Sequence, residues 1–253
     1  MCYDIKALQQ AQLKRYRYWN EQNRLRDLEE KENAEKPVDL YHASGFSHPK
    51  LYAYLNEEAY IPKVVQWGLV PFWVKEVAQA KQIWNKTLNA KGETMFDLPS
   101  FRDSSKSKRC LIYVDGFYEH HHFGGKAYPY FIQRKDREPM VLAGIWSNWK
   151  NPDDSSIWTT FSIVTTKANK LMARIHNNPD LDEPRMPLIL PEASADEWLM
   201  PVKNDSDKQF ITSMIQPYNP EEMDAYTVGT LRGKNAVGNR PDVSNKVEYP
   251  GLD

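Results

Sequence analysis

The most reactive pair of groups in this sequence would form if Cys2 became the first residue of the chain. Cytosolic aminopeptidases usually remove a methionine that precedes a small residue, and Cys2 would then carry a free α-amine and a thiol on adjacent carbons. Both groups are partly nucleophilic near neutral pH. Such a pair condenses with an aldehyde to a five-membered thiazolidine, which an internal cysteine cannot form. Alternatively, the amine could act as base for its own thiol in amide hydrolysis. Taken alone, a cysteine at position 2 is more often without a chemical role.

Three further residues have the chemistry to assist such a nucleophile. Glu119 ends an apolar strand after a glycine, where desolvation can raise its pKa toward the range of a general acid or base. His176 can transfer protons near neutral pH, and the side-chain carbonyl of Asn89 could orient an amine. Taken singly, each is more often structural: a strand-end carboxylate, a hydrogen-bonded histidine, and a helix cap or turn.

The run of three histidines at 120–122 does not predict a metal site. Alternating strand residues point to opposite faces, so only His120 and His122 could share a ligand face, and no third ligand follows at a suitable spacing. Cys110 lies inside an apolar strand and is expected to be an inert core residue. The sequence contains no phosphate-binding loop and no dinucleotide fingerprint. We therefore expect neither a metal nor another cofactor.

Charge is balanced overall but uneven along the chain. The 33 Lys+Arg and 34 Asp+Glu give a net charge of −1, which argues against strong non-specific DNA binding. Residues 63–109 nevertheless hold nine basic and four acidic side chains, whereas residues 192–224 hold eight acidic and two basic ones. The 8 Trp and 14 Tyr include candidates for stacking on nucleic-acid bases. The basic segment is thus a candidate phosphate-binding face, although two solvated surfaces of opposite charge explain the same counts.

Composition indicates a globular protein, with 41% hydrophobic and 26% charged residues. No stretch approaches the roughly 18 consecutive apolar residues of a membrane span, so no membrane partner is expected. The first residues have no secretory signal pattern. We therefore expect a cytoplasmic protein with Cys2 and Cys110 as reduced thiols.

The pattern of apolar residues and turns predicts a single α+β domain covering residues 1–253. Its centre should be a bent, mainly antiparallel, barrel-like β-sheet, because β-branched and aromatic runs follow one another with short connections. Helices should lie at the periphery. Strands are expected at 50–54, 63–67, 109–118, 128–134, 140–146, 158–166 and 186–190, and helices at 7–36, 74–80, 98–107, 167–174 and 194–199.

Several short motifs occur in one order along nearly the whole chain. They are Cys2, WGLVPFW at 67–73, LNAKGE at 88–93, SFR at 100–102, RC at 109–110, DGFYE at 115–119, IH at 175–176, RMPLIL at 185–190 and AVGN at 236–239. Each is weak by itself, but together they resemble the SOS response-associated peptidase (SRAP) family. The resemblance implies a protein that binds single-stranded DNA and reacts covalently with abasic sites, forming a thiazolidine at the N-terminal cysteine.

The resemblance also assigns roles to the candidate catalytic residues. Cys2 would be the nucleophile, and Asn89 would position its amine. Glu119 would shuttle the protons that open the deoxyribose ring, and His176 would assist formation and reversal of the imine. Family members are further proposed to cleave the bond before the cysteine themselves, and to have lyase activity.

A second set of residues would bind the DNA. Trp67 and Trp73 would shape a base-stacking turn, while Lys91, Arg102 and Arg185 would contact DNA, the first two at phosphates. Two other interpretations keep part of this picture. An N-terminal-cysteine amide hydrolase would need Cys2, Glu119 and His176 but not the basic segment, and a non-catalytic DNA-binding module would need only the latter.

The chain departs from the usual family pattern at several positions. Tyr3 and Asp4 follow Cys2 where the family usually has Gly-Arg, and Lys91 stands where an arginine is usual, which keeps the charge but loses bidentate geometry. Residues 177–184 are inserted after His176. These departures affect the expected DNA contacts more than the core chemistry.

Overall fold

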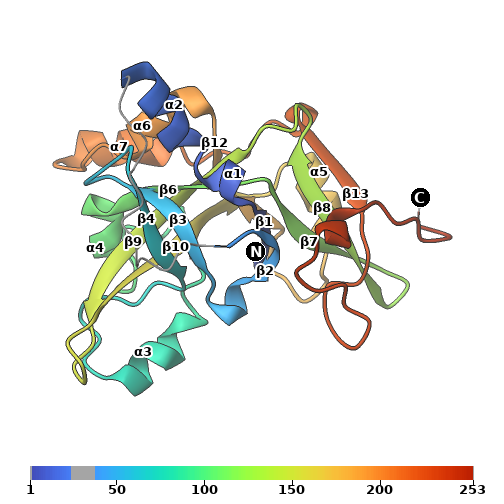
Figure 1. The fold of residues 1–253 in the computed structure, drawn as a ribbon, viewed down its shortest axis with the longest axis horizontal. Coiled ribbons are helices and arrows are strands. Elements are labelled where there is room, and N and C mark those ends of the chain that lie inside the picture. Colours follow the sequence, from blue (N-terminus) through green and yellow to red (C-terminus); the bar gives the residue numbers. More distant parts are fainter. Residues whose placement is uncertain (1, 24–37, 253) are drawn as a thin grey trace.

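Five strands close into a small barrel in the computed structural model, which describes residues 2–23 and 38–252 (Figure 1). The barrel strands are β3 (Lys50–Leu55), β4 (Pro62–Trp67), β6 (Arg109–Val114), β9 (Met140–Lys150) and β10 (Ile157–Lys167). Pairing runs from β10 through β4, β3, β6 and β9 and returns to β10. Only the β4–β10 pair of this ring is parallel. The predicted α+β class and barrel-like, mainly antiparallel sheet are confirmed.

Three short strands extend the barrel sheet. β5 (Asn89–Lys91) pairs in parallel with β10, and β11 (Arg185–Pro187) pairs with the same strand in antiparallel orientation. β12 (Ile189–Leu190) pairs with β9. The LNAKGE and RMPLIL motifs thus both have residues paired with β10, although the motifs lie almost a hundred residues apart in the sequence.

A second, antiparallel sheet lies beside the barrel. Its strands, in spatial order, are β13 (Met223–Thr227), β8 (Lys126–Arg134), β7 (Gly116–Phe123), β1 (Asp4–Ala7) and β2 (Leu40–Ser44). The first residues of the chain thus lie in the middle of the molecule, where Figure 1 marks the N-terminus between the two sheets.

The chain passes from one sheet to the other at Asp115, so the single strand expected at 109–118 is wrong. The Asp115 carboxylate accepts a hydrogen bond from the Leu8 backbone N–H at 2.7 Å, which holds the bend. Gly116 follows because a β-carbon there would lie 2.3 Å from the Ile132 carbonyl oxygen. The bend lets β7 leave the barrel and pair with β1.

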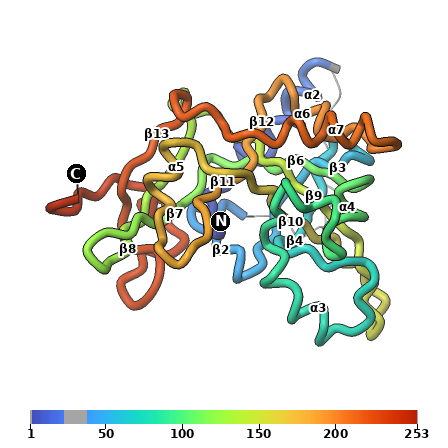
Figure 2. Tube along the Cα trace, turned by 180° about the vertical axis from the view of Figure 1, so that it is seen from behind, coloured from blue at the N-terminus to red at the C-terminus, as the bar shows by residue number. Residues whose placement is uncertain are grey.

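The helices lie around the sheets (Figures 1 and 2). They are α1 (Gln9–Gln12), α2 (Lys14–Asn23), α3 (Val77–Trp84), α4 (Arg102–Ser107), α5 (Lys170–Ile175), α6 (Ala195–Trp198) and α7 (Asp205–Ser213). The long helix expected at 7–36 is interrupted at Leu13, and its part at 24–37 lies outside the described residues. Among the described residues, no helix is long and apolar enough to cross a membrane.

Much of the tryptophan content serves the core. Trp67, Trp146, Trp149 and Trp198 are all fully buried. Each of the four indole N–H groups also donates a hydrogen bond, so burial leaves no unpaired donor there. Cys110 is likewise fully buried inside β6, as expected for an inert core residue.

Candidate functional site

Cys2 lies at the junction of the two sheets, immediately before β1. β1 pairs with β7, with Asp4 opposite Tyr118 and Ile5 opposite Phe117. This register brings the start of the chain beside the end of the DGFYE motif. The Cys2 side chain is 1% exposed, and its backbone carbonyl accepts a hydrogen bond from Asn89 Nδ2 at 2.8 Å. Cys2 is therefore held on one side by β5, which extends the barrel sheet, and on the other by the second sheet.

Glu119 is the carboxylate next to Cys2. It is 9% exposed, and burial raises its pKa to about 7, although Oε1 accepts a hydrogen bond from the His120 backbone N–H at 3.0 Å. Burial, and then the charge of Glu119, raise the pKa of the Cys2 thiol as well. At neutral pH the thiol is thus protonated, while Glu119 is poised to give or take a proton.

His176 follows α5 and reaches the same place. Its Nδ1 lies 2.9 Å from the Arg185 carbonyl oxygen and 3.0 Å from the Arg185 amide nitrogen, so the backbone of β11 fixes the ring. Its Nε2 lies 3.9 Å from Glu119 Oε2, too far for a direct hydrogen bond but close enough for one substrate oxygen to contact both. Burial lowers the pKa of His176 to about 4. The ring is therefore neutral at pH 7, and its predicted role in proton transfer stays a prediction.

Asn89 has an unused acceptor beside Cys2. Its Nδ2 is bonded to the Cys2 carbonyl, but its buried Oδ1 has no hydrogen-bond partner among the residues that the structure describes. A buried acceptor without a partner typically costs about 1–3 kcal/mol. The geometry thus favours a ligand or terminal amine that donates a hydrogen bond to Oδ1.

A pocket opens over these residues, which we call the site pocket. It is lined by Tyr3, Asp4, Glu119, His120, His122, Ala127, His176, Asn178, Leu181 and Arg232. The inserted segment 177–184 contributes two of these side chains, and the backbone N–H of His122 donates to its Asn177 Oδ1 at 2.7 Å. Cys2 is buried and is not among the residues that line the pocket.

An ion-paired cluster at the rim of the site pocket was missed from sequence. The buried Asp4 carboxylate contacts His42 Nε2 at 3.0 Å and Arg232 Nη2 at 2.5 Å. Burial opposes ionisation of Asp4, but the His42 hydrogen bond and the Arg232 charge outweigh it and hold the pKa of Asp4 below its ordinary value. Asp4 therefore stays ionised, and its negative charge is balanced by Arg232, which lines the site pocket.

The proposed stacking turn is divided between buried and exposed aromatic rings. Trp67 is fully buried, and its indole N–H donates to the Leu88 carbonyl at 2.8 Å, so Trp67 supports the turn from the core and its ring does not face solvent. Gly68 turns the chain with φ of +115°, and a β-carbon there would lie 2.1 Å from the Trp84 ring. Beyond the turn, Phe72 is 62% and Trp73 37% exposed. Phe72, not selected from sequence, is thus the more exposed ring.

The three basic residues that were predicted to contact DNA differ in their exposure. Lys91, at the end of β5, and Arg102, at the start of α4, are exposed. Arg185 is buried, and its guanidinium pairs with Glu93 at 2.6 Å and Glu183 at 2.9 Å. The expected DNA contact by Arg185 is not supported in this arrangement, because its charge is already matched by two carboxylates.

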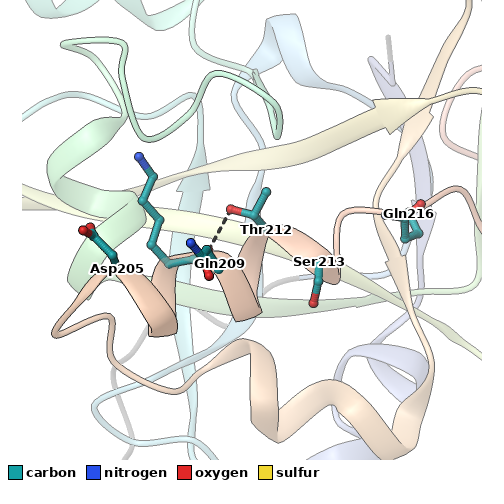
Figure 3. A pocket seen from close by; sticks show the side chains of 6 residues that line it. Asp205, Gln209, Thr212, Ser213 and Gln216 are labelled. Atoms are coloured by element: carbon teal, nitrogen blue, oxygen red, sulfur yellow. Dashed lines mark hydrogen bonds between the residues drawn. The ribbon is translucent and has the colours of Figure 1, made fainter.

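A different pocket lies far from Cys2, on α7 (Figure 3). It is lined by Asp205, Lys208, Gln209, Thr212, Ser213 and Gln216. The Thr212 hydroxyl is bonded to the Lys208 backbone carbonyl at 2.7 Å, as is common for threonine within a helix. The lining residues bring together no nucleophile with an acid–base partner, so the candidate active site is the site pocket.

Comparison with known proteins identifies the family of the chain. Residues 5–235 match the family model described as SOS response associated peptidase (SRAP). The chain belongs to the SRAP family. The family model thus covers both sheets and the segments that bring Glu119, His176 and Asn89 to the site.

Relatives of this SRAP chain have names that state a role. It is 38% identical over 168 residues to the abasic site processing protein YoqW of Bacillus subtilis (strain 168), covering 66% of this chain and 69% of that protein. It is 32% identical over 155 residues to the abasic site processing protein HMCES of Gallus gallus, covering 53% and 44%.

Solved structures share the fold. A protein from Bacteroides thetaiotaomicron, 28% identical, superposes with a TM-score of 0.80 over 98% of this chain and 100% of that one. A protein from Bordetella bronchiseptica, 22% identical, superposes with a TM-score of 0.70 over 90% of this chain and 99% of that one.

Proposed function

We propose that this SRAP protein senses abasic sites in single-stranded DNA and cross-links to them covalently through Cys2, protecting the lesion during the DNA damage response. The observation that carries the proposal is the convergence of Cys2, Asn89, Glu119 and His176 at one junction between the sheets. The names of the relatives supply the substrate class. The proposal applies to the chain once Cys2 is its first residue.

The reaction begins with the sugar. An abasic deoxyribose is mostly a closed hemiacetal, and its aldehyde is released when one group protonates the ring oxygen while another accepts the hydroxyl proton. Glu119, with a pKa of about 7, can do either. His176 stays neutral and contacts the same oxygen, because its Nε2 lies within 3.9 Å of the carboxylate.

Two bonds to the same carbon then form. The Cys2 amine attacks the aldehyde carbon to give a carbinolamine, which loses water to an imine. The thiol adds to the imine carbon, its sulfur forms the second bond, and its proton moves to the nitrogen through Glu119. Asn89 Oδ1 accepts a hydrogen bond from the amine and holds it toward the pocket. The product is a thiazolidine, and one water leaves.

The same groups would serve two further activities that we include in the proposal. Cleavage of the bond before Cys2 would use the thiol as nucleophile and Glu119 as its base. Strand cleavage next to the lesion would proceed from the imine, with Glu119 moving the proton. Both depend on the same carboxylate, so neither needs a second site.

The decisive experiment mixes the purified protein with an oligonucleotide that carries one abasic site. A heat-stable shifted band is expected for the wild type. Cys2→Ser should lose the heat-stable band, because an oxazolidine is far more labile than a thiazolidine. Cys2→Ala keeps the amine, so it should give a band only after borohydride trapping. Undiminished heat-stable cross-linking by Cys2→Ala would contradict the proposal.

A further inference from the structure

A second pocket adjoins the site pocket, and we call it the flank pocket. It is lined by His120, Lys126, Ala127, Tyr128, Pro129, Thr230, Leu231, Arg232, Tyr249 and Pro250. It shares His120, Ala127 and Arg232 with the site pocket. The two pockets therefore adjoin at these three residues. The flank pocket lies between β8 and the C-terminal segment, which run close together in both views (Figures 1 and 2).

The charge of the flank pocket suits a phosphate. Its lining residues, all in the described part of the chain, include Arg232 and Lys126 but no acidic side chain. The Arg232 side chain is 53% exposed and uses Nη2 to contact Asp4, whereas a guanidinium carries five N–H donors. Asp4 lies two residues from Cys2, so this contact fixes an exposed positive charge at a set distance from the nucleophile.

The aromatic and apolar residues that line the flank pocket suit a base. The rings of Tyr128 and Tyr249 form an edge-to-face pair, with centroids 5.1 Å apart and planes at 71°. The Tyr249 hydroxyl donates to the Val228 carbonyl at 2.7 Å, which fixes the ring while leaving its aromatic surface for contact. Pro129, Leu231 and Pro250 add apolar surface. Aromatic surface beside a basic groove is the usual arrangement in proteins that bind single strands.

We infer that the flank pocket binds the nucleotide adjoining the abasic site, with Arg232 and Lys126 on its phosphate and the Tyr128–Tyr249 pair against its base. The inference rests on the proposed function, because an abasic sugar in the site pocket is what directs the next nucleotide across Arg232. The strand would thus be held on both sides of Cys2, by the flank pocket and by the exposed face near Trp73.

The first test measures binding of undamaged single-stranded DNA by fluorescence anisotropy as salt is raised. Arg232→Gln and Lys126→Gln should each lower the slope of log affinity against log salt by about 0.7, the value for one phosphate contact. Arg232→Lys should keep the slope. Arg240→Gln is the matched control, because Arg240 is also exposed and paired with an aspartate but lies outside both pockets.

The second test locates the nucleotide. Oligonucleotides carry a tetrahydrofuran abasic analogue, which cannot react, with zero to three nucleotides on its 5′ or its 3′ side. Wild-type affinity should rise when nucleotides are added on either side. Arg232→Gln should remove the gain on one side only, and Tyr249→Leu should weaken that same gain by about 5- to 100-fold.

The outcomes separate the inference from the proposed function. If Arg232→Gln and Lys126→Gln bind every oligonucleotide as the wild type does, the flank pocket does not bind DNA and the inference is overturned. If Arg232→Gln does not fold, Lys126→Gln decides alone, because Lys126 is exposed on β8. If the wild type fails to cross-link reactive abasic DNA while these variants still lower the salt slope, the proposed chemistry fails and the binding site stands.

Discussion

Polar and ionisable side chains around Cys2 are buried, whereas those around Trp73 are exposed. Glu119 and His176 are at most 9% exposed. Burial raises the pKa of Glu119 and lowers the pKa of His176, so it favours the neutral form of both side chains. Lys91 and Arg102 are exposed to solvent, so their charges are accessible to a phosphate and are screened by salt. In the proposed function, burial would tune proton transfer in the first region, and exposure would make the charges of the second available to DNA. The comparison predicts that the two regions can be disabled separately.

The largest effect is expected from the acid–base pair. Positioned proton-transfer groups typically contribute about 10²- to 10⁴-fold to a rate. Glu119→Gln should slow single-turnover cross-linking by an amount in this range while leaving affinity for the abasic analogue nearly unchanged. The wild-type rate should inflect near pH 7, where Glu119 titrates, and this inflection should be absent from Glu119→Gln.

His176 provides the contrast within that experiment. Because its pKa is about 4, it does not titrate between pH 5 and 9. His176→Gln should therefore slow the reaction but keep the inflection near pH 7. An inflection lost in His176→Gln and kept in Glu119→Gln would reverse the assignment of the two residues.

A cost in stability should accompany the raised pKa of Glu119. The carboxyl has a pKa of 4.5 as a model compound and about 7 in the fold, so the folded state binds the proton more tightly. Ionisation above pH 7 thus opposes folding, and this penalty fades as the pH falls from 7 toward 4.5. Glu119→Gln should be more stable than the wild type at pH 8 by up to about 3 kcal/mol, with the difference shrinking at pH 5. Urea unfolding at both pH values measures it, with Glu57→Gln, which removes an exposed carboxylate outside the site, as the control.

Stacking at the exposed face should cost less and depend little on salt. Trp73→Ala should weaken single-stranded DNA binding by about 1–3 kcal/mol with nearly the same salt slope. Tyr18→Ala, which removes an exposed ring from α2, should bind as the wild type does. A Trp73→Ala protein with unchanged affinity would place the stacking surface elsewhere, with Phe72 as the next candidate.

The smallest effects belong to the exposed charges. Lys91→Gln and Arg102→Gln should each reduce the salt slope by about 0.7, whereas Lys203→Gln, in the acidic part of the chain, should leave it unchanged. Rates of cross-linking at saturating DNA should stay near the wild-type value. A large loss of that saturated rate would show that the two regions are not separable.

The sequence predicted the sheet well because alternation and turn chemistry are local signals. Strands 50–54, 63–67 and 128–134 fall within one or two residues of the observed ones. The break at Asp115 was missed because RCLIYVDGFY is apolar on both sides of it, and the bend depends on a hydrogen bond to Leu8, more than a hundred residues away. Local propensity does not contain that contact.

The sequence indicated which residues are candidates for the site better than it predicted their protonation states and exposure. The order of the motifs indicated Cys2, Asn89, Glu119 and His176 as candidates. The burial of side chains could not be predicted in the same way. In the fold, burial keeps His176 neutral, and Trp67 and Arg185 lie inside the protein and not in solvent. The Arg232–Asp4 pair joins residues 228 positions apart and has no local pattern. The AVGN motif likewise has a structural use, since Asn239 Oδ1 accepts hydrogen bonds from the backbone N–H groups of both Tyr41 and His42.

The order in which the chain is synthesised gives the position of Cys2 a further consequence. β1 lies between β2 and β7, and the partners of Cys2 come from residues 89, 119 and 176. Cys2 is synthesised well before residues 89, 119 and 176, whose side chains would assist its reaction in the proposed function. In the proposed function, the cysteine of a nascent chain would thus have no acid–base help, and assisted reaction with aldehydes would begin only once the second sheet has packed against the barrel. Completion of folding would therefore be the event that activates the Cys2 nucleophile.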